Sequence, residues 1–299
     1  MASFEVRAVI AVLFLLGLMA LLPEAFTWHQ LNDTSGLPLA PPDWGHPLGT
    51  DALGRDAWTR LVYATRYSLL VGLLASLIAL VLGVCVGLLA GSATGWISEL
   101  LMRLTDLADA IPGLLLALFL VALWGSGLVQ ISFALGLVGW TAMARVLRAR
   151  LLSVREEEFI LAARAIGVRP LRLAFSHLLP HAFAPLLVLI PFRIEISVVA
   201  EASLSFLGLG DLSRPSLGTM LHDAQPLLRE CWWLLAGPGA MLLIIVFAPS
   251  VLADHLQQWT EPRLRRRLSA SAVRSTVQPG SPPNASDKLP PVFQRPANK

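Results

Sequence analysis

Long apolar runs alternate with short polar stretches along this chain, and the length of each run predicts the elements. A helix that crosses a lipid bilayer needs about 20 mostly apolar residues, and six runs approach that length. They are predicted near Val6–Leu22, Ser68–Ala90, Ala108–Leu123, Leu128–Ala144, Phe183–Ala200 and Leu234–Ala253. Arg7 gives the first run the start of a signal peptide, but no small-residue cleavage site follows it, so we expect an uncleaved helix.

The composition supports a membrane protein. The chain of 299 residues is 55% hydrophobic and 14% charged, with a mean hydropathy of +0.66, whereas soluble domains are roughly a quarter charged. The formal net charge of +3 is too small to suggest nucleic acid as a partner. Cys85 and Cys231 give no disulfide framework. The predicted fold class is therefore an all-α membrane protein with six transmembrane helices.

Arginine sets the expected orientation, because cytoplasmic loops of membrane proteins carry an excess of basic residues. The stretch between the fourth and fifth runs and the stretch after the last run are both rich in arginine. Their arginines are Arg145, Arg148, Arg150, Arg155, Arg164, Arg169 and Arg172, and Arg263, Arg265, Arg266 and Arg267. Both stretches are predicted to be cytoplasmic, and an even number of spans then puts both termini inside. Residues 24–62 and 202–232 fall outside.

The patterns also divide the chain into parts. Residues 1–64 hold the first helix and an external segment, and residues 65–254 form the main membrane domain. Residues 262–299 are rich in Ser and Pro and are predicted to be a disordered cytoplasmic tail. In the second run, glycines recur at every fourth position and share one helix face. These glycines, Gly83, Gly87 and Gly91, predict a close contact with another helix, within or between subunits.

The loop at about residues 145–182 is too polar to span a membrane and too regular in pattern to be a linker. Its apolar residues recur at helical spacing, after acidic residues that suit a helix N-terminus. They are Phe159, Ala162, Ala163 and Ile166, after Glu156, Glu157 and Glu158. Gly167 is placed where a helix ends, and a second helix is predicted over Leu171–Leu178, with Pro180 stopping it. Two short helices on the cytoplasmic face are thus predicted; an amphipathic helix on lipid headgroups is the alternative.

One stretch of this loop resembles a known motif. The stretch from Leu161 to Gly167, with Leu179-Pro180 after it, resembles the cytoplasmic "EAA" loop of ABC importer permeases. That family's pattern is Glu-Ala-Ala, three residues, Gly, nine residues, Ile-x-Leu-Pro. The residues that match in register are Ala162, Ala163, Gly167, Leu179 and Pro180. Leu161 replaces the glutamate and His177 the isoleucine, and both departures are similar to the dipeptide/oligopeptide/nickel branch.

Two further stretches resemble the same branch, in the same order and at similar spacing. One runs from His46 to Asp56, before the second span, and the other runs from Ala200 to Gly210, with Ser216–Leu221 after it. The resemblance covers roughly residues 1–262 and is to the C-type permease subunit. It implies the type-1 ABC importer permease fold for residues 65–254, with the loop at about 145–182 coupling the pore to an ATPase.

The resemblance implies a transport subunit and not an enzyme. It implies a multi-pass protein of a bacterial-type inner membrane that forms half of the pore for peptides or peptide-like solutes, nickel complexes among them. The implied partners are a second homologous permease subunit, two ATP-binding subunits, an external solute-binding protein and membrane lipid, without nucleic acid or a cofactor. Because Lys288 and Lys299 are the only lysines, the chain has no Gly-x-x-x-x-Gly-Lys loop, and partner subunits are expected to hydrolyse ATP.

A secondary active transporter is the alternative function. Such a protein carries buried acids or broken helices near the bilayer midplane, and Asp106, Asp109 and Pro112 are the residues that favour it.

Three sets of candidate site residues follow, none of them catalytic. The expected ATPase-coupling residues are Ala162, Ala163, Arg164, Gly167, Leu179 and Pro180. The candidate pore or intramembrane polar residues are Arg193, Glu195 and Glu201. The candidate external contacts are Gly49, Thr50, Asp51, Gly54, Arg55 and Asp56.

Two alternatives stay open for these residues. The segment around Asp51 either faces the binding protein or is a structural loop capped by its own aspartates. Arg193 and Glu195 either line the pore or form ion pairs between helices, for example with Asp106 or Asp109. No metal site is expected at His177 and His181, because Pro180 interrupts the helix that would hold them.

Overall fold

The computed structural model describes residues 2–34, 36–93, 95–211 and 213–260. The chain divides into two compact units, Met1–His255 and Leu256–Lys299, and the helices that carry the candidate residues belong to the first. Regular structure in the described residues is helical, which confirms the all-α prediction, and one isolated β-bridge among them joins Thr50 and Asp56. The tail predicted over residues 262–299 lies outside the described residues.

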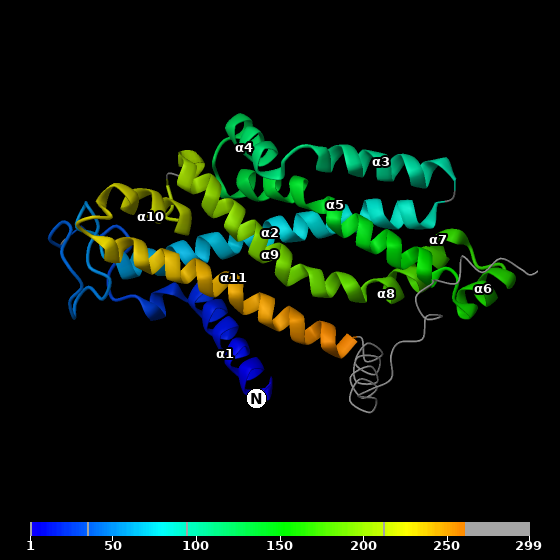
Figure 1. Ribbon diagram of the computed structural model, residues 1–299, viewed down its shortest axis with the longest axis horizontal. Coiled ribbons are helices and arrows are strands. Elements are labelled where there is room, and N and C mark those ends of the chain that lie inside the picture. The colour runs from blue at the N-terminus through cyan, green and yellow to red at the C-terminus, as the bar shows by residue number, and fades with distance from the viewer. Residues whose placement is uncertain (1, 35, 94, 212, 261–299) are drawn as a thin grey trace, which may run out of the picture. The chain divides into compact units, whose positions relative to one another are not determined.

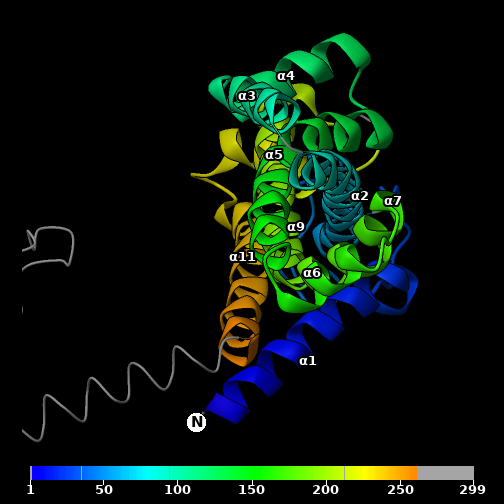
Figure 2. The ribbon, with the colours of Figure 1, turned by 90° about the vertical axis from the view of Figure 1, so that its right-hand side faces the viewer.

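Three long helices form the middle of the first unit. They are α2 (Ala57–Ser92), α5 (Leu128–Val154) and α9 (Ala184–Leu204), and they run side by side in both views (Figure 1, Figure 2). Asp56 begins α2 as its N-cap, because its carboxylate accepts a hydrogen bond from the Thr59 backbone N–H at 2.7 Å. Apolar side chains dominate all faces of α2, as expected for a helix surrounded by lipid and protein.

The glycines of α2 face α5, which identifies the helix that the sequence left unnamed. A Cβ added at Gly87 would lie 2.8 Å from the Ala144 carbonyl oxygen, and one added at Gly91 would lie 2.8 Å from Leu151 Cβ. Gly83 meets the same helix equally closely. Because a side chain has no room at these positions, glycine lets the two backbones approach. The predicted close contact is confirmed, and it lies within the subunit.

The third predicted span is not a continuous helix. The prediction placed it at Ala108–Leu123, but α3 (Trp96–Ala110) ends and α4 (Gly113–Trp124) begins inside that range, with a bend of 82° between them. Pro112 lies at the break, where its missing N–H and its ring prevent the helix from continuing. Ala108–Leu123 is therefore not one continuous helix, because the proline interrupts the apolar run, although the bent pair is long and apolar enough to be one span.

Three helices of the described residues are long and apolar enough to cross a membrane, or up to five if each bent pair is one span. The three are α2, α5 and the first 20 residues of α11 (Trp232–Thr260). The bent pairs are α3 with α4, and residues 174–182 with 184–209. The apolar part of α1 (Ala2–Leu21), residues 7–21, is shorter than these. The count of six spans and the orientation stay predictions.

The connecting segments gather at two ends of this unit (Figure 1). One end holds residues 27–56 and the short elements η1 (Pro23–Phe26), η3 (Ser205–Leu209), α10 (Leu217–Ala224) and η4 (Gln225–Leu227). The other end holds α6 (Glu158–Ala165), α7 (Pro170–Leu173), η2 (Ala174–Leu178) and α8 (Leu179–Ala182). The two sets of motif residues therefore lie at opposite ends of the same long helices.

Candidate functional site

The segment between α5 and α9, called the Gly167 loop below (residues 158–182), turns sharply at its glycine. Gly167 has φ +78°, a left-handed conformation that ends α6. The Gly167 N–H donates to the Arg164 carbonyl at 3.0 Å, and the Val168 N–H donates to the Ala163 carbonyl at 3.2 Å. These bonds use carbonyls that the end of a helix would leave free. The predicted end of the first short helix is therefore confirmed.

The second piece of the Gly167 loop is longer than predicted. Pro180 does not stop it, because α7, η2 and α8 follow one another from Pro170 to Ala182. A proline ring collides with the carbonyl four residues back, and a wider π turn relieves this collision. The Leu179 N–H accordingly donates to the Ala174 carbonyl, five residues back. A bend of 59° separates this piece from α9.

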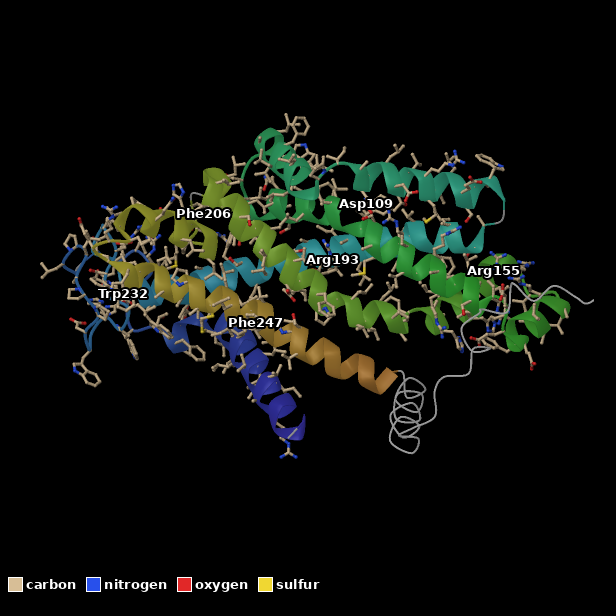
Figure 3. All side chains as sticks on the ribbon, viewed as in Figure 1. Asp109, Arg155, Arg193, Phe206, Trp232 and Phe247 are labelled. Carbon is tan, nitrogen blue, oxygen red and sulfur yellow. The ribbon has the colours of Figure 1, made fainter. Side chains whose placement is uncertain are left out.

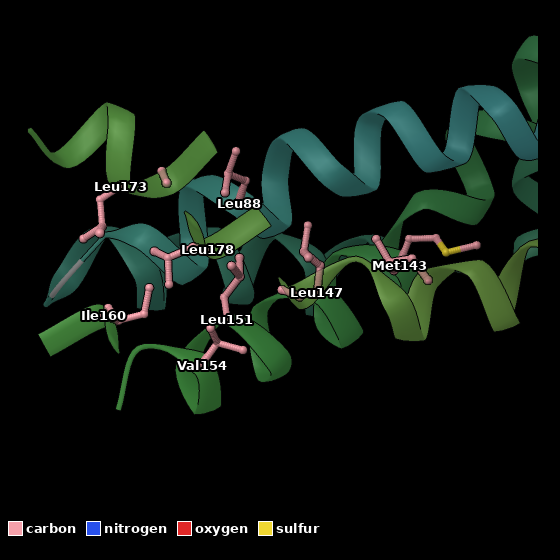
Figure 4. Packing of buried hydrophobic residues seen from close by; sticks show 11 residues of the cluster. Leu88, Met143, Leu147, Leu151, Val154, Ile160, Leu173 and Leu178 are labelled. Atoms are coloured by element: carbon pink, nitrogen blue, oxygen red, sulfur yellow. The ribbon is translucent and has the colours of Figure 1, made fainter. Parts of the chain in front are cut away.

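The inner face of the Gly167 loop is packed into the end of the long helices (Figure 4). Ile160 of α6 is fully buried, and Leu173 and Leu178 are buried with it against Leu88 of α2 and Leu151 of α5. Burial of such a side chain stabilises by about 1.5–3 kcal/mol. The loop is therefore fixed to α2 and α5 by apolar packing, and it does not hang free.

The outer face of the same loop is exposed and mixed in character. Phe159, Leu161 and Ile166 are exposed, and Ile166, next to the turn, is 82% exposed. Exposed arginines surround them: Arg164, Arg169 and Arg172, with no ion pair to any residue that the structure describes. Exposed apolar side chains beside unpaired cations are typical of a surface that binds an acidic protein.

The candidate coupling residues divide between these two faces. Ala162, Arg164, Gly167 and Pro180 are exposed, whereas Ala163 and Leu179 are half-buried against the inner cluster. Small residues on the outer side let another surface approach α6 closely. The arrangement places all six residues in one short segment.

Arg155 connects the Gly167 loop to α2, a contact that the sequence did not indicate. Its Nη1 donates to the Gly91 carbonyl at 2.8 Å and to the Ala93 carbonyl at 3.3 Å, at the C-terminal end of α2. A cation is favoured there because the helix dipole is negative at that end. Burial lowers the pKa of the Arg155 guanidinium, and the positive charge of Arg164 lowers it further. Arg155 is the C-cap of α5 and lies three residues before the loop, so it ties the chain that leads into the loop to the end of α2.

At the opposite end, residues 46–56, called the Asp51 segment below, are held by their own polar groups. The Asp51 carboxylate accepts from the Leu53 and Arg55 N–H groups at 2.8 and 2.9 Å. It also accepts from Arg55 Nε at 2.7 Å and from Arg60 Nη1 at 2.8 Å. Thr50 is fully buried, and its hydroxyl donates to the Leu37 carbonyl. One aspartate therefore organises the turn and also pairs with both nearby arginines.

Asp56 and the two glycines complete the Asp51 segment. One carboxylate oxygen of Asp56 caps α2, and the other accepts a hydrogen bond from His46 Nδ1 at 3.0 Å. Gly49 and Gly54 have φ +68° and +77°, which only glycine adopts without strain. A Cβ at Gly49 would also lie 2.8 Å from Trp233 Nε1. The structural role expected for this segment is thus present in its geometry, and contact with a binding protein stays a prediction.

A hollow of about 450 Å³ lies beside the Asp51 segment, between Arg55, Arg60, Asp211, Arg214 and Asp223. Arg60 Nη2 lies 3.5 Å from Asp223 Oδ2 across it. Burial raises the pKa of Asp223, although the nearby charges of His222 and Arg55 lower it. The described residues contain no group of three or more metal-binding side chains. The side chains that line the hollow carry charges of both signs, as is typical of a surface that meets polar solutes or proteins.

Glu201 joins three helices at one buried point. It is fully buried, and it accepts from Ser68 of α2 at 2.6 Å and from Ser205 at 2.6 Å. The Leu217 N–H, in α10, donates to the same Ser68 hydroxyl at 3.3 Å. Gly208, with φ +86°, turns the chain between α9 and α10. Glu201 therefore secures the helices around it instead of facing open space.

Arg193 and Glu195 face different helices of the unit. Ser250 of α11 donates to Glu195 at 2.9 Å, whereas Arg193 lies against Gly139 of α5, where an added Cβ would overlap Nη2. Arg193 lies about midway between the labelled Phe206 and Arg155 (Figure 3). Asp106 and Asp109, which the sequence offered as partners, are 2.9 and 2.7 Å from Arg145 instead. The suggested pairing with Arg193 was therefore wrong for this chain.

A family model described as "Binding-protein-dependent transport system inner membrane component" matches residues 83–266. The dipeptide transport system permease protein DppC of Bacillus subtilis is 35% identical over 229 residues, which cover 76% of this chain and 71% of that protein. The di/tripeptide transport system permease protein DppC of Pseudomonas aeruginosa is 38% identical over 234 residues, with 76% and 77% covered. The oligopeptide transport system permease protein OppC of Bacillus subtilis is 33% identical over 257 residues, with 85% and 84% covered.

A similar chain occurs in a solved structure titled "Inward facing conformations of the MetNI methionine ABC transporter". The TM-score is 0.54 with 19% identity, and the match covers 66% of this chain and 94% of that chain. At this identity the likeness concerns the fold alone. It agrees with the helical membrane fold that the sequence predicts for residues 65–254.

Proposed function

We propose that this chain, which belongs to the family of binding-protein-dependent transport system inner membrane components, forms half of the pore of an ATP-driven peptide importer. Membership gives a multi-pass inner-membrane transport subunit that works with ATPase and substrate-binding components. The relatives' names support peptides as the solute class, since dipeptide, di/tripeptide and oligopeptide permeases all match over most of this chain. A bacterial-type membrane is part of the same proposal.

The two-faced Gly167 loop is the observation that carries the mechanism. Its inner face is buried against α2 and α5, so a force on the loop reaches the long helices. Its outer face offers Ile166 and exposed arginines to a partner. We assign Ala162, Ala163, Arg164, Gly167, Leu179 and Pro180 to the docking and positioning of an ATP-binding subunit. Coupling is mechanical, through a rigid element that biases a pore with two states.

The remaining parts of the proposal follow the family. The pore is completed by a second homologous permease, and two separate ATP-binding subunits hydrolyse ATP. Six spans place both termini and the Gly167 loop in the cytoplasm, and the Asp51 segment outside. There the exposed parts of that segment and the hollow near Arg214 face an external solute-binding protein.

Uptake into proteoliposomes tests the function. The full importer, with its second permease, ATPases and binding protein, is expected to accumulate labelled di- and tripeptides only when ATP is present. The control importer carries a Lys→Ala change in the phosphate loop of its ATPases and should accumulate none. Uptake driven by a proton or sodium gradient without ATP would instead establish a secondary transporter.

A further inference from the structure

The guanidinium of Arg193, in the middle of α9, has no hydrogen-bond or ion-pair partner among the described residues. We propose that Arg193 binds the carboxylate of the peptide during its passage through the membrane. This inference rests on the proposed function and adds the chemical group that the pore recognises.

Four carboxylates of the described residues have other partners. Asp106 and Asp109 both pair with Arg145, and Glu195 accepts from Ser250. Glu201 accepts from Ser68 and Ser205. A cation within a membrane span is expensive unless an opposite charge meets it. None of these carboxylates meets Arg193, so its charge has no counter-ion among the described residues, and a bound ligand can supply one.

The packing around Arg193 shows how such an anion is admitted. Its Nε is buried with no hydrogen-bond partner, while the side chain as a whole is only half-buried. The Nη2 side lies in space that Gly139 leaves empty on α5. One donor is therefore sealed between α5 and α9, and a small separation of these helices exposes it. A transporter whose helices move during each cycle provides that separation.

This partly covered position suits a ligand that binds and leaves during transport. The contact with Gly139 covers only part of the guanidinium: Nε is buried, whereas the side chain as a whole is half-buried, so its other donors stay open to a ligand. Guanidinium donors form a planar fork that matches a carboxylate with two parallel hydrogen bonds. Every unmodified peptide carries one such group at its C-terminus, whatever its side chains. The site therefore suits a pore that accepts many peptide sequences.

The preference for a free carboxylate is the quantity to measure. Peptides of one sequence, as free acids and as C-terminal amides, are taken up by proteoliposomes that hold the full importer and its binding protein. Arg193→Gln is expected to lower the ratio of acid to amide uptake by about tenfold relative to wild type. Dividing by the wild-type ratio removes the binding protein's own preference, which is the same in every assay. Arg193→Lys, which keeps the charge, is expected to retain most of the ratio.

Two further variants separate a ligand site from a structural role. Gly139→Ala removes the space that Nη2 occupies and is expected to lower the ratio as Arg193→Gln does. Arg66→Gln, on the exposed side of α2, is expected to leave it unchanged. An unchanged ratio in Arg193→Gln overturns the proposal. Equal loss of acid and amide uptake, with loss of the copurifying second permease, also overturns it and assigns Arg193 to the subunit interface.

The wild-type importer distinguishes the two proposals. If wild type imports no peptide of either form, the proposed function fails and the carboxylate site fails with it. If wild type imports peptides and the ratio does not respond to Arg193→Gln, the importer stands and only the carboxylate site is rejected.

Discussion

The Asp51 segment and the Gly167 loop lie at opposite ends of the same helices and are held by different forces. Around Asp51, one carboxylate accepts from two backbone N–H groups and from two arginines. Around Gly167, the fixed face is apolar and centres on Ile160 and Leu178. The arginines there stay exposed and free of ion pairs to any described residue.

The difference indicates which end has charged groups free to bind a partner. Charges in the Asp51 segment are used to stabilise that segment, so changes there should affect stability first. Charges on the Gly167 loop contribute little to its own fold, so changes there should affect a partner first. Variants at the two ends test this contrast.

Gly167→Asp should give the largest effect. An aspartate at φ +78° is strained and adds a negative charge to the face expected to meet the ATPase. We expect transport to be abolished while the protein remains in the membrane at normal amount, as measured by peptide uptake and by immunoblot of membranes.

Gly95→Asp is the matched control. Gly95 also has a left-handed φ, +71°, with nothing within 4 Å of its would-be Cβ, but it lies outside the Gly167 loop. It should keep most transport. Normal uptake by Gly167→Asp would remove the docking role from the loop.

Arg155→Ala should give the next effect. It removes two charge-assisted bonds to the end of α2, so that only the apolar packing around Leu88 still connects the loop to α2. We expect the number of peptides transported per ATP hydrolysed to fall roughly tenfold, in line with a loss of 1–2 kcal/mol. Parallel assays of uptake and phosphate release measure this ratio.

Arg103→Ala is the control for Arg155→Ala. Arg103 is 73% exposed and pairs only with Glu99 of the same helix among the described residues. In Arg103→Ala the number of peptides transported per ATP hydrolysed should therefore equal that of wild type. An unchanged ratio in Arg155→Ala would mean that apolar packing alone carries the force.

Asp51→Asn should reduce stability more than coupling. It leaves Arg60, which is nearly buried, without its shortest ion pair, at a cost of about 2 kcal/mol. We expect a lower Tm in detergent and an unchanged ratio of transport to ATP hydrolysis in the protein that remains folded. Asp43→Asn, at an exposed carboxylate, should change neither quantity. A normal Tm with lost transport would reassign Asp51 to binding.

Asp223 should give the smallest effect, seen as a pH dependence. Because 59% of its side chain is exposed, the rise in its pKa caused by burial is only partly effective. A raised pKa in the fold stabilises the protonated form, so this contribution is full below the ordinary aspartate pKa and is lost as pH rises through the folded pKa. The Tm difference between wild type and Asp223→Asn should therefore change across mildly acidic pH and then level off. A difference that is constant with pH would contradict this.

Glycines were the most predictable residues. Gly83, Gly87 and Gly91 indicated a close helix contact, and Gly167 indicated a helix end, because a missing Cβ has few uses in a helix. Prolines were less predictable. Pro112 breaks a helix, but Pro180 is absorbed by a π turn, and the choice depends on whether a carbonyl five residues back can be used. Tertiary packing decides whether that carbonyl can accept the hydrogen bond, and this packing cannot be read from one stretch of sequence.

The partners of charged residues could not be predicted for a related reason. Asp106 and Asp109 pair with Arg145, and Arg155 reaches Gly91 across 64 positions of sequence. Each pairing depends on the rotation of two helices about their own axes, and spacing along either helix leaves that rotation undetermined. Ile160 was missed likewise, because the outward stripe of Phe159, Ala162 and Ile166 is just as apolar as the buried side.

α2 is a long helix without a break, and its glycines hold it close against α5. With 36 residues at about 1.5 Å each, α2 is about 54 Å long, and no proline interrupts it. A bend such as the 82° angle between α3 and α4 would absorb a force by changing its angle, whereas a continuous helix such as α2 transmits the force along its axis. Arg155 binds the C-terminal end of α2, and the Asp51 segment is joined to the N-terminal end, where Asp56 is the cap. A tilt of α2 at one end should therefore be transmitted directly to the other end, so that the Gly167 loop and the Asp51 segment move together.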